Sequence, residues 1–180
     1  MRTVIYGGAC SLDGFLAGPD GAIDWLHFSA DVQAEMTKSF ARADALVFGR
    51  KTWDTAVASG GGGAMPGVKG YVCSRTLTSL PDGSGVELVT GDAAGFVRDL
   101  KQRPGKDILI MSGGSLARSL LAVGVIDEIG LNVHPVLLGS GVPAFLDCGT
   151  RVPLALKEAR TLDGGCVLVT YRVGPLNART

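Results

Sequence analysis

Apolar runs and amphipathic stretches alternate along the first two thirds of the chain. Runs rich in β-branched and aromatic residues predict strands at residues 2–9, 45–49, 69–74, 86–90 and 107–114. Apolar residues at helical spacing predict helices at residues 29–44, 52–58, 91–105 and 115–125. Ser29, Thr52, Asp92 and Ser115 are predicted to cap these helices. This alternation favours an α/β layered domain with a mostly parallel sheet.

The last third of the chain has a different pattern. Residues 126–141, 153–162 and 166–174 are typical of strands joined by turns, and they predict an antiparallel region that completes the sheet. Residues 11–28 contain two Asp-Gly pairs and a proline, and they predict a long ordered loop that forms a lid. Residues 59–67 include four consecutive glycines and predict a mobile surface turn.

Length and composition limit the possible classes of protein. The chain has 180 residues, the usual size of one domain, so we expect a single domain over residues 1–180. Hydrophobic residues make up 46%, which is typical of a globular protein rather than a disordered one. The formal net charge is zero, so no overall field favours nucleic acid or an anionic membrane. No apolar run is long enough to span a membrane and no signal-peptide pattern is present, so we expect a cytoplasmic protein.

The four cysteines, Cys10, Cys73, Cys148 and Cys166, are widely spaced and form no C-x-x-C pair. Only two histidines are present as imidazole partners, so the spacing of a zinc site is absent and we expect no bound metal. The cysteines are interpreted as small core residues.

Polar and charged residues follow three of the predicted strands, at the edge where an open α/β sheet binds its ligands. These junctions are "GRKTW" at 49–53, "SRT" at 74–76 and "SGGSL" at 112–116. Paired glycines let a backbone approach a ligand, and the amides of the following helix favour an anion. Arg50 and Arg75 add guanidinium groups, whose shape matches phosphate oxygens. A pyrophosphate site beside a separate phosphate site predicts NADP(H).

Each of these features also has a plainer interpretation. A glycine pair between a strand and a helix is a common tight turn, and a single exposed cation is typical of any solvated surface. No G-x-G-x-x-G motif follows the first predicted strand, so the site is not of the usual Rossmann kind. Guanidinium groups at two strand ends, on one edge of the sheet, together favour a phosphate site over these plainer interpretations.

Five stretches along the chain are "SLDGFLAGPDGAIDW", "LVFGRKTW", "CSRT", "MSGGSL" and "IDEIGLNVHPVLLGSGVPAF". In this order and spacing they resemble the dihydrofolate reductase superfamily, in the branch of the reductase domain of riboflavin biosynthesis, the RibD C-terminal domain family. The resemblance covers nearly the whole chain. It implies a three-layer α/β/α fold with a central mixed, mostly parallel sheet, and NADPH bound across the strand ends.

The resemblance also implies which residues bind the cofactor. "GRKT" would hold the adenosine phosphate and the pyrophosphate, "SR" the 2′-phosphate, and "GGSL" the pyrophosphate. A backbone position at the end of the first strand would contact the nicotinamide carboxamide, under a lid formed by residues 13–25. The implied cofactor residues are Ala9, Gly49, Arg50, Lys51, Thr52, Ser74, Arg75, Gly113, Gly114, Ser115 and Leu116.

The substrate side departs from the bacterial dihydrofolate reductases, which carry a carboxylate on the helix after the lid. Counting along the motifs places that position at Ala30 or Gln33, and neither residue is acidic. Asp31 is the nearby candidate for a catalytic carboxylate, and Glu35 is a candidate for substrate binding. An acid in the first turns of a helix is also a common partner of the helix dipole.

Three further residues are candidates for the substrate side or its surroundings. Asp13, at the start of the lid, is a candidate for catalysis and substrate contact, although a simple Asp-Gly turn is an alternative interpretation. Trp25, at the end of the lid, is a candidate for substrate binding. His134 precedes a proline on a predicted core strand and is interpreted as an interior histidine.

The C-terminal motif favours the riboflavin-pathway reductases, which reduce a ribosyl carbonyl on an aminopyrimidine phosphate. The predicted function is therefore NADPH-dependent hydride transfer to a heterocycle-linked sugar carbonyl or a similar small substrate. Two alternatives stay open: a dihydrofolate reductase-like enzyme acting on a pterin, and a catalytically silent NADP-binding protein. The H-x-E and P-C-x-x-C signature of the zinc deaminases is absent, so we expect no deaminase activity. The family also implies a homodimer built through the last strands.

Overall fold

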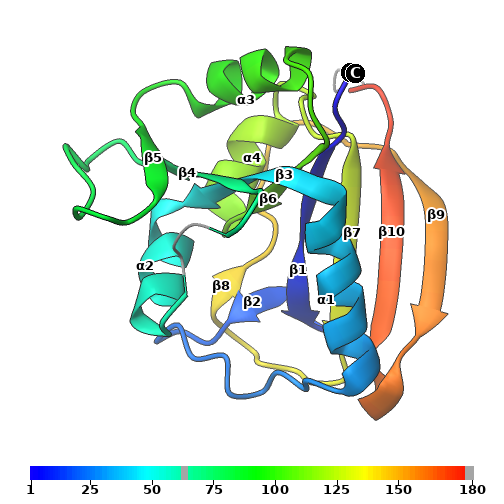
Figure 1. Cartoon of the computed structure of the whole chain (residues 1–180). Helices are drawn as coiled ribbons and strands as arrows, with labels where there is room; N and C mark the ends of the chain where they lie inside the picture. The colour runs from blue at the N-terminus through cyan, green and yellow to red at the C-terminus, as the bar shows by residue number, and fades with distance from the viewer. Residues whose placement is uncertain (62–64, 177–180) are drawn as a thin grey trace.

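The computed structural model of the protein describes residues 1–61 and 65–176. Within this part, eight strands form one sheet in the order β5-β4-β3-β6-β1-β7-β10-β9 (Figure 1). They are β1 (Val4–Ser11), β3 (Ala43–Gly49), β4 (Lys69–Cys73), β5 (Val86–Val89), β6 (Asp107–Met111), β7 (Glu128–His134), β9 (Leu154–Thr161) and β10 (Val167–Val173). Two short strands, β2 (Phe15–Ala17) and β8 (Val142–Pro143), pair separately.

The large sheet is parallel over most of its width. The neighbouring strands from β5 across to β7 all pair in parallel, whereas β10 is antiparallel to both β7 and β9. The predicted combination of a mostly parallel sheet and an antiparallel final third is therefore confirmed. Because the parallel strands point the same way, their carboxyl ends lie along one edge of the sheet.

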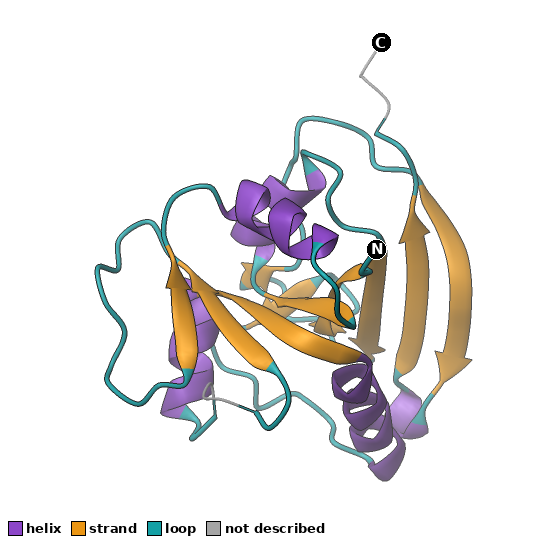
Figure 2. Cartoon of the chain, turned by 45° about the horizontal axis from the view of Figure 1, so that its top comes forward, coloured by secondary structure: helices purple, strands orange, loops and turns teal. Residues whose placement is uncertain are grey.

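Helices cover both faces of the sheet and give the three layers that the resemblance implies (Figure 2). On one face, Trp53 packs with Phe48 of β3, and on the other Val97 and Leu120 belong to the same buried cluster as Ile110 of β6. Full burial of each such side chain contributes about 1.5–3 kcal/mol. The first face carries α1 (Ala30–Arg42) and α2 (Arg50–Ala58), and the second carries α3 (Ala93–Gln102) and α4 (Gly114–Leu121).

Two of the predicted helix caps are confirmed. The Ser29 hydroxyl accepts a hydrogen bond from a first-turn amide of α1, and the Asp92 carboxylate does the same at α3. The predicted loop of residues 11–28 differs from expectation, because it contains β2, which pairs with β8. The two Asp-Gly pairs there indicate turns, and a strand of three residues is too short to give a recognisable pattern of its own. A single 3-10 turn, η1 (Asp163–Gly165), joins β9 to β10.

The interior bears out most of the interpretation of the cysteines. Cys10, Cys73 and Cys166 are buried, whereas Cys148 is half-buried. Within the described ranges, no group of three or more His, Cys, Asp or Glu side chains is placed to hold a metal ion. None of the helices in residues 1–61 and 65–176 is long and apolar enough to cross a membrane. Residues 62–64 of the predicted glycine-rich turn lie outside the described residues.

Candidate active site

The candidate site lies where β3, β4 and β6 end. Strand register brings these ends together, because Gly49 pairs with Cys73 across β3 and β4, and Phe48 pairs with Met111 across β3 and β6. The three junctions singled out in the sequence therefore leave the sheet at neighbouring positions. The expectation that they share one edge is confirmed.

Two helices begin directly at this edge, each with a glycine as its N-cap. α2 follows Gly49 and α4 follows Gly113, and neither cap makes a side-chain hydrogen bond. The first amides of both helices are left for an anion, and the helix dipoles add partial positive charge there. The prediction that Thr52 and Ser115 cap these helices is wrong, because both helices start earlier and include these residues in their first turns.

Close packing requires glycine at this edge independently of any ligand. A Cβ on Gly49 would lie 3.1 Å from the Ser112 Cβ, and a Cβ on Gly114 would lie 2.9 Å from the Pro143 carbonyl oxygen. Leu116, the last residue of "GGSL", packs against the core beneath α4. Gly49 and Gly114 thus have a structural reason to be present as well as their predicted roles at the cofactor phosphates.

The hydroxyl of Ser112 is the strongest sign of a ligand at the edge. Its oxygen is buried and has no hydrogen-bond partner among the described residues. Buried polar atoms are nearly always hydrogen-bonded, so one without a partner between two uncapped helices is suited to a ligand oxygen. This observation fits the phosphates of a dinucleotide at the strand ends.

Arg50 already has a partner at the start of α2. Its Nε lies 2.7 Å from Oδ2 of Asp54, one turn later in the helix, and both side chains are partly exposed. Exposed pairs at this spacing contribute only about 0.3–0.5 kcal/mol, so a phosphate can displace Asp54. Lys51 is exposed beside them. Arg50 and Lys51 are therefore placed to contact an anion, and neither side chain is buried in the core.

Ser74 shapes the turn that follows β4. Its hydroxyl oxygen accepts hydrogen bonds from the amides of Thr76 and Leu77, and the residue is buried. Arg75 lies between these anchored positions and is exposed. A fixed turn that presents one exposed guanidinium agrees with the predicted binding of a 2′-phosphate, which stays a prediction.

β1 separates from β6 beyond Tyr6. Its pairing with β6 covers the first three residues of the strand, whereas its pairing with β7 continues to the strand's end. From Gly7 onward, the backbone edge of β1 that faces β6 therefore has no strand partner. Gly8 is exposed, and nothing lies within 4 Å of its Cβ position. The opened edge includes Ala9, where the resemblance implies contact with the nicotinamide carboxamide.

Asp13 holds two loops together. Its carboxylate accepts a hydrogen bond from the Ser11 hydroxyl at 2.6 Å and others from the amides of Leu138 and Gly139. The bond from Ser11, followed by those from the backbone amides, lowers the pKa of Asp13. These contacts agree with the turn interpretation, and the catalytic role of Asp13 stays a prediction.

Asp31 and Glu35 both bind the β9–β10 region. Asp31 accepts a hydrogen bond from the Asp163 amide at 2.7 Å, and the Ser29 hydroxyl is the main cause of its lowered pKa. Glu35 lies 2.7 Å from Nη2 of Arg160 and also pairs with a lysine of α1, which is the main cause of its lowered pKa. Both carboxylates are engaged within the protein, so their predicted roles toward a substrate gain no support from these contacts.

The lid ends in an aromatic contact with His134. The ring of Trp25 lies edge-on to the imidazole at 5.4 Å, and the Trp25 Nε1 is buried without a hydrogen-bond partner among the described residues. His134 is itself buried and hydrogen-bonded, which confirms its interpretation as an interior histidine. Asn132, next to it on β7, also has a buried oxygen without a partner. No motif marks Asn132 in the sequence, where it is one polar residue within an apolar run.

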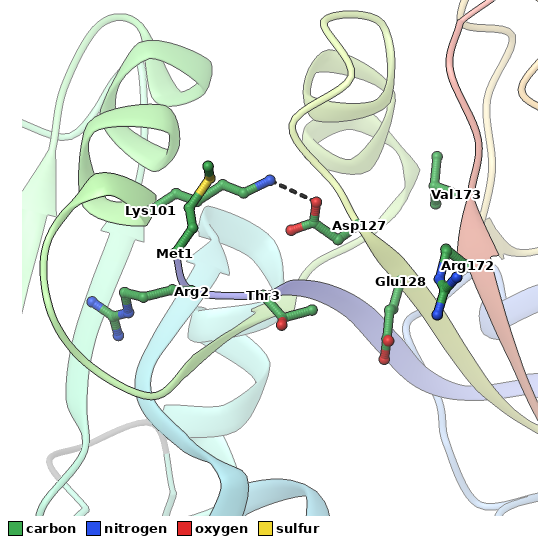
Figure 3. A pocket seen from close by; sticks show the side chains of 8 residues that line it. All are labelled: Met1, Arg2, Thr3, Lys101, Asp127, Glu128, Arg172 and Val173. Carbon is green, nitrogen blue, oxygen red and sulfur yellow. Dashed lines mark hydrogen bonds and ion pairs between the residues drawn. The ribbon is translucent and has the colours of Figure 1, made fainter.

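Two hollows of the surface lie at the opposite edge of the sheet, where the parallel strands begin. One, of about 340 Å³, is lined by Arg2, Lys101 and Asp127 among others, and Figure 3 shows Lys101 reaching toward Asp127. Another, of about 520 Å³, shares Arg2. No predicted site residue lines either hollow.

Known protein families and solved structures include relatives of this chain. The family model of the RibD C-terminal domain matches residues 2–168. The chain belongs to this family. An uncharacterised protein of Bacillus subtilis strain 168, YyaP, is 32% identical over 187 residues, which cover 95% of both proteins. The crystal structure of a "Putative riboflavin biosynthesis protein" from Shewanella sp. PV-4 is similar with a TM-score of 0.84 and 28% identity, covering 97% of this chain and 100% of that chain.

The fold is also shared with a more distant enzyme. Dihydrofolate reductase from Enterococcus faecalis, complexed with NADP(H) and RAB-propyl, has a TM-score of 0.65 at 15% identity, covering 96% of this chain and 97% of that chain. This similarity confirms the predicted dihydrofolate reductase-like fold. Membership of the RibD C-terminal domain family supports a reductase-like role of the riboflavin-pathway type.

Proposed function

We propose that this chain is an NADPH-dependent reductase of the riboflavin-pathway type, resembling 5-amino-6-(5-phosphoribosylamino)uracil reductase. The observation that carries the proposal is the pair of uncapped helix N-termini at Gly49 and Gly113, together with the unpartnered Ser112 hydroxyl between the strand ends. Amides at a helix N-terminus favour phosphate oxygens. The exposed cations Arg50 and Lys51 add charge at the same edge.

NADPH rather than NADH is supported by Arg75. The turn held by Ser74 presents this guanidinium at the end of β4, beside the start of α2. NADPH differs from NADH by a 2′-phosphate, and the planar fork of an arginine suits such a group. We assign Ser74 and Arg75 to the 2′-phosphate, and the first turns of α2 and α4 to the remaining phosphates.

The chemistry follows from the cofactor and from placement. When bound, NADPH supplies a hydride, and reduction of a carbonyl adds that hydride at carbon and one proton at oxygen. The protein's part is to hold the reacting groups in place, which alone lowers a barrier substantially. The opened backbone edge at Ala9 would orient the nicotinamide carboxamide, and the lid that ends at Trp25 would cover the substrate.

A second candidate is NADP binding without catalysis. One observation favours it: the carboxylates of Asp13, Asp31 and Glu35 are all engaged in contacts within the protein. The same observation counts against a pterin reductase, which needs a carboxylate beside the pterin ring. A carbonyl reductase has no such requirement, because water can supply the proton to the oxygen.

Turnover separates these candidates. The purified protein is mixed with NADPH and 5-amino-6-(5-phosphoribosylamino)uracil, and the loss of NADPH absorbance is followed. Oxidation that depends on this substrate and is absent with dihydrofolate supports the proposed function. Tight NADPH binding without turnover of either compound supports the silent cofactor-binding protein instead, and turnover of dihydrofolate alone supports the pterin reductase.

The proposal includes a homodimer formed through the last strands. β9 is the edge strand of the large sheet, and all eight of its residues are exposed. Leu154 and Leu156 lie on the same side of this strand, and their side chains are 45% and 61% exposed. An unprotected edge with exposed leucines favours pairing with another chain, and a second copy is the partner that the family implies.

A further inference from the structure

The side chain of Asn132 points to the α1 face of the sheet. On β7 it lies in register with Ala9 of β1 on one side and Leu168 of β10 on the other. Leu168 packs with Val32 of α1, which identifies the face. Asn132 is therefore a direct neighbour of the residue assigned to the nicotinamide, and on the side of the sheet where the lid ends.

One end of the Asn132 carboxamide is held and the other is not. Nδ2 lies 3.1 Å from Nε2 of His134, while Oδ1 is buried without a partner among the described residues. The two ends of a carboxamide have almost the same shape, so a rotation of 180° about its last bond exchanges them without disturbing any neighbour. The protonation of His134 decides which end is free.

Two donors converge on Nδ1 of His134. The backbone amide of His27 donates to it at 3.3 Å, and the thiol sulfur of Cys166 lies 3.5 Å away. A backbone N–H has no lone pair to offer, so Nδ1 must be an acceptor. Burial lowers the pKa of His134, which keeps the ring neutral. The one ring proton is then on Nε2.

A protonated Nε2 needs an acceptor, and the carboxamide of Asn132 is the group at hydrogen-bond distance from it, 3.1 Å away. The carboxamide therefore turns Oδ1 toward His134 and leaves its NH₂ group as the buried end without a partner. Trp25 Nε1 is a second buried donor without a partner, on the ring that packs against the same imidazole. Two unpartnered N–H donors thus adjoin His134. Such donors suit an oxygen acceptor.

We propose that the NH₂ group of Asn132 donates a hydrogen bond to a carbonyl oxygen of the substrate and that this contact selects substrates of the uracil type. The inference rests on the proposed function and assigns part of its substrate specificity. Both kinds of ring carry carbonyl oxygens and N–H groups, but a pterin bound through its N–H donors needs an acceptor such as a carboxylate, whereas either carbonyl oxygen of a pyrimidinedione accepts from a neutral donor. A neutral donor at this position therefore favours a ring that presents a carbonyl oxygen to it and disfavours a pterin bound through its N–H groups.

Two substitutions and one control test the contact. Asn132→Asp keeps the shape and the acceptor for His134 but replaces the donor with an oxygen, and Asn132→Leu removes both polar groups. Thr170→Val is the control, because Thr170 lies on the same sheet face one register step away, opposite Gly130. For both test variants we expect kcat/KM for 5-amino-6-(5-phosphoribosylamino)uracil to fall on the order of 10- to 100-fold, with the NADPH dissociation constant unchanged.

A second measurement does not depend on a folded variant. The side-chain amide of Asn132 is followed by ¹⁵N NMR in the wild-type protein with NADP⁺, before and after the same uracil compound is added. A downfield shift of its NH₂ protons is expected. If wild-type protein turns over the compound while this signal stays in place, or while both folded variants keep the wild-type kcat/KM, the inference is overturned and the proposed function stands. If wild-type protein binds NADPH but neither binds nor reduces the compound, the proposed function fails and the inference with it.

Discussion

Gly49 and Ser112 meet where β3 and β6 leave the sheet, and a Cβ at position 49 would lie 3.1 Å from the Ser112 Cβ. This contact closes the space between the two strand ends just below the first turn of α2. The Ser112 hydroxyl is already without a partner there, so any shift of its backbone also moves a group assigned to the cofactor.

Gly49→Ala is therefore expected to weaken NADPH binding and to cost about 1–3 kcal/mol of unfolding free energy through overpacking. Fluorescence titration with NADPH and urea unfolding measure the two effects. Gly130→Ala, in β7 of the same sheet, is the matched control, because its Cβ would meet only the Thr170 hydroxyl at 3.9 Å. Equal NADPH affinity in the two variants would show that the end of β3 is not part of the cofactor site.

Arg75→Ala is expected to weaken NADPH far more than NADH, because only NADPH carries the 2′-phosphate. Loss of a charge-assisted hydrogen bond corresponds to about 1.5–3 kcal/mol, or roughly 10- to 100-fold in the NADPH dissociation constant. Arg98→Ala, which removes another exposed arginine on α3, is the control for overall charge. Equal weakening of both cofactors by Arg75→Ala would contradict the assignment to the 2′-phosphate.

The ion pair between Arg50 and Asp54 gives two opposite predictions. Arg50→Ala is expected to raise the apparent KM for NADPH, since it removes a cation from the phosphate site. Asp54→Asn is expected to lower it about two- to fivefold, because it frees Arg50 and removes a nearby negative charge. Steady-state kinetics at low and high salt measure both, and the difference between the variants is expected to shrink at high salt. An unchanged KM in both variants would leave Arg50 as an ordinary surface residue.

His134 makes the stability of the protein depend on pH. Burial, with a smaller contribution from His27, lowers its pKa below 6.5 in the folded state. The unfolded chain then binds more protons between the lowered pKa and about 6.5, so stability is complete above that range and falls as the pH drops through it. Urea unfolding above and below pH 6.5 is expected to show this loss of stability in the wild type. The loss is expected to be absent in His134→Gln. A pH response that persists in the variant would assign it to other groups.

Leu156→Lys is expected to shift the protein from dimer to monomer, because it places a charge on the exposed side of β9. Sedimentation velocity measures the change. Val123→Lys, at a residue after α4 that is 45% exposed, is the control for adding a lysine to an apolar surface position. A wild-type protein that is monomeric at micromolar concentration would contradict the dimer itself.

The order of elements and the candidate cofactor edge were predictable from the sequence for a physical reason. Parallel strands end on one side of a sheet, so the junctions after β3, β4 and β6 had to meet once the alternating pattern of strands and helices was recognised. Register then places Gly49 next to Cys73, so that "GRKTW" and "SRT" are neighbours. Motifs at strand ends, whose relative positions follow from a parallel sheet, therefore predicted the cofactor edge.

The substrate side was not predictable in the same way. Asp31 and Glu35 looked like candidates because of their place on the helix, but their contacts with Asp163 and Arg160 depend on the distant β9–β10 hairpin. Thr52 and Ser115 failed as caps because glycine started each helix earlier than the hydroxyl signal indicates. Asn132 carries no local signal, since its importance arises only when His134 takes one end of its carboxamide.

The early separation of β1 from β6 has a consequence for how this protein can change over time. The opened edge at Gly7 and Ala9 consists of backbone groups, which every amino acid supplies alike. Under the proposed function, cofactor orientation at Ala9 is therefore tolerant of side-chain replacement, whereas Gly7 must stay glycine, because a Cβ there would lie 2.7 Å from the Gly130 carbonyl oxygen. Substrate preference, under the contact proposed for Asn132, depends instead on a single side chain of β7. Mutation can thus alter the compound that is reduced while the source of the hydride stays the same.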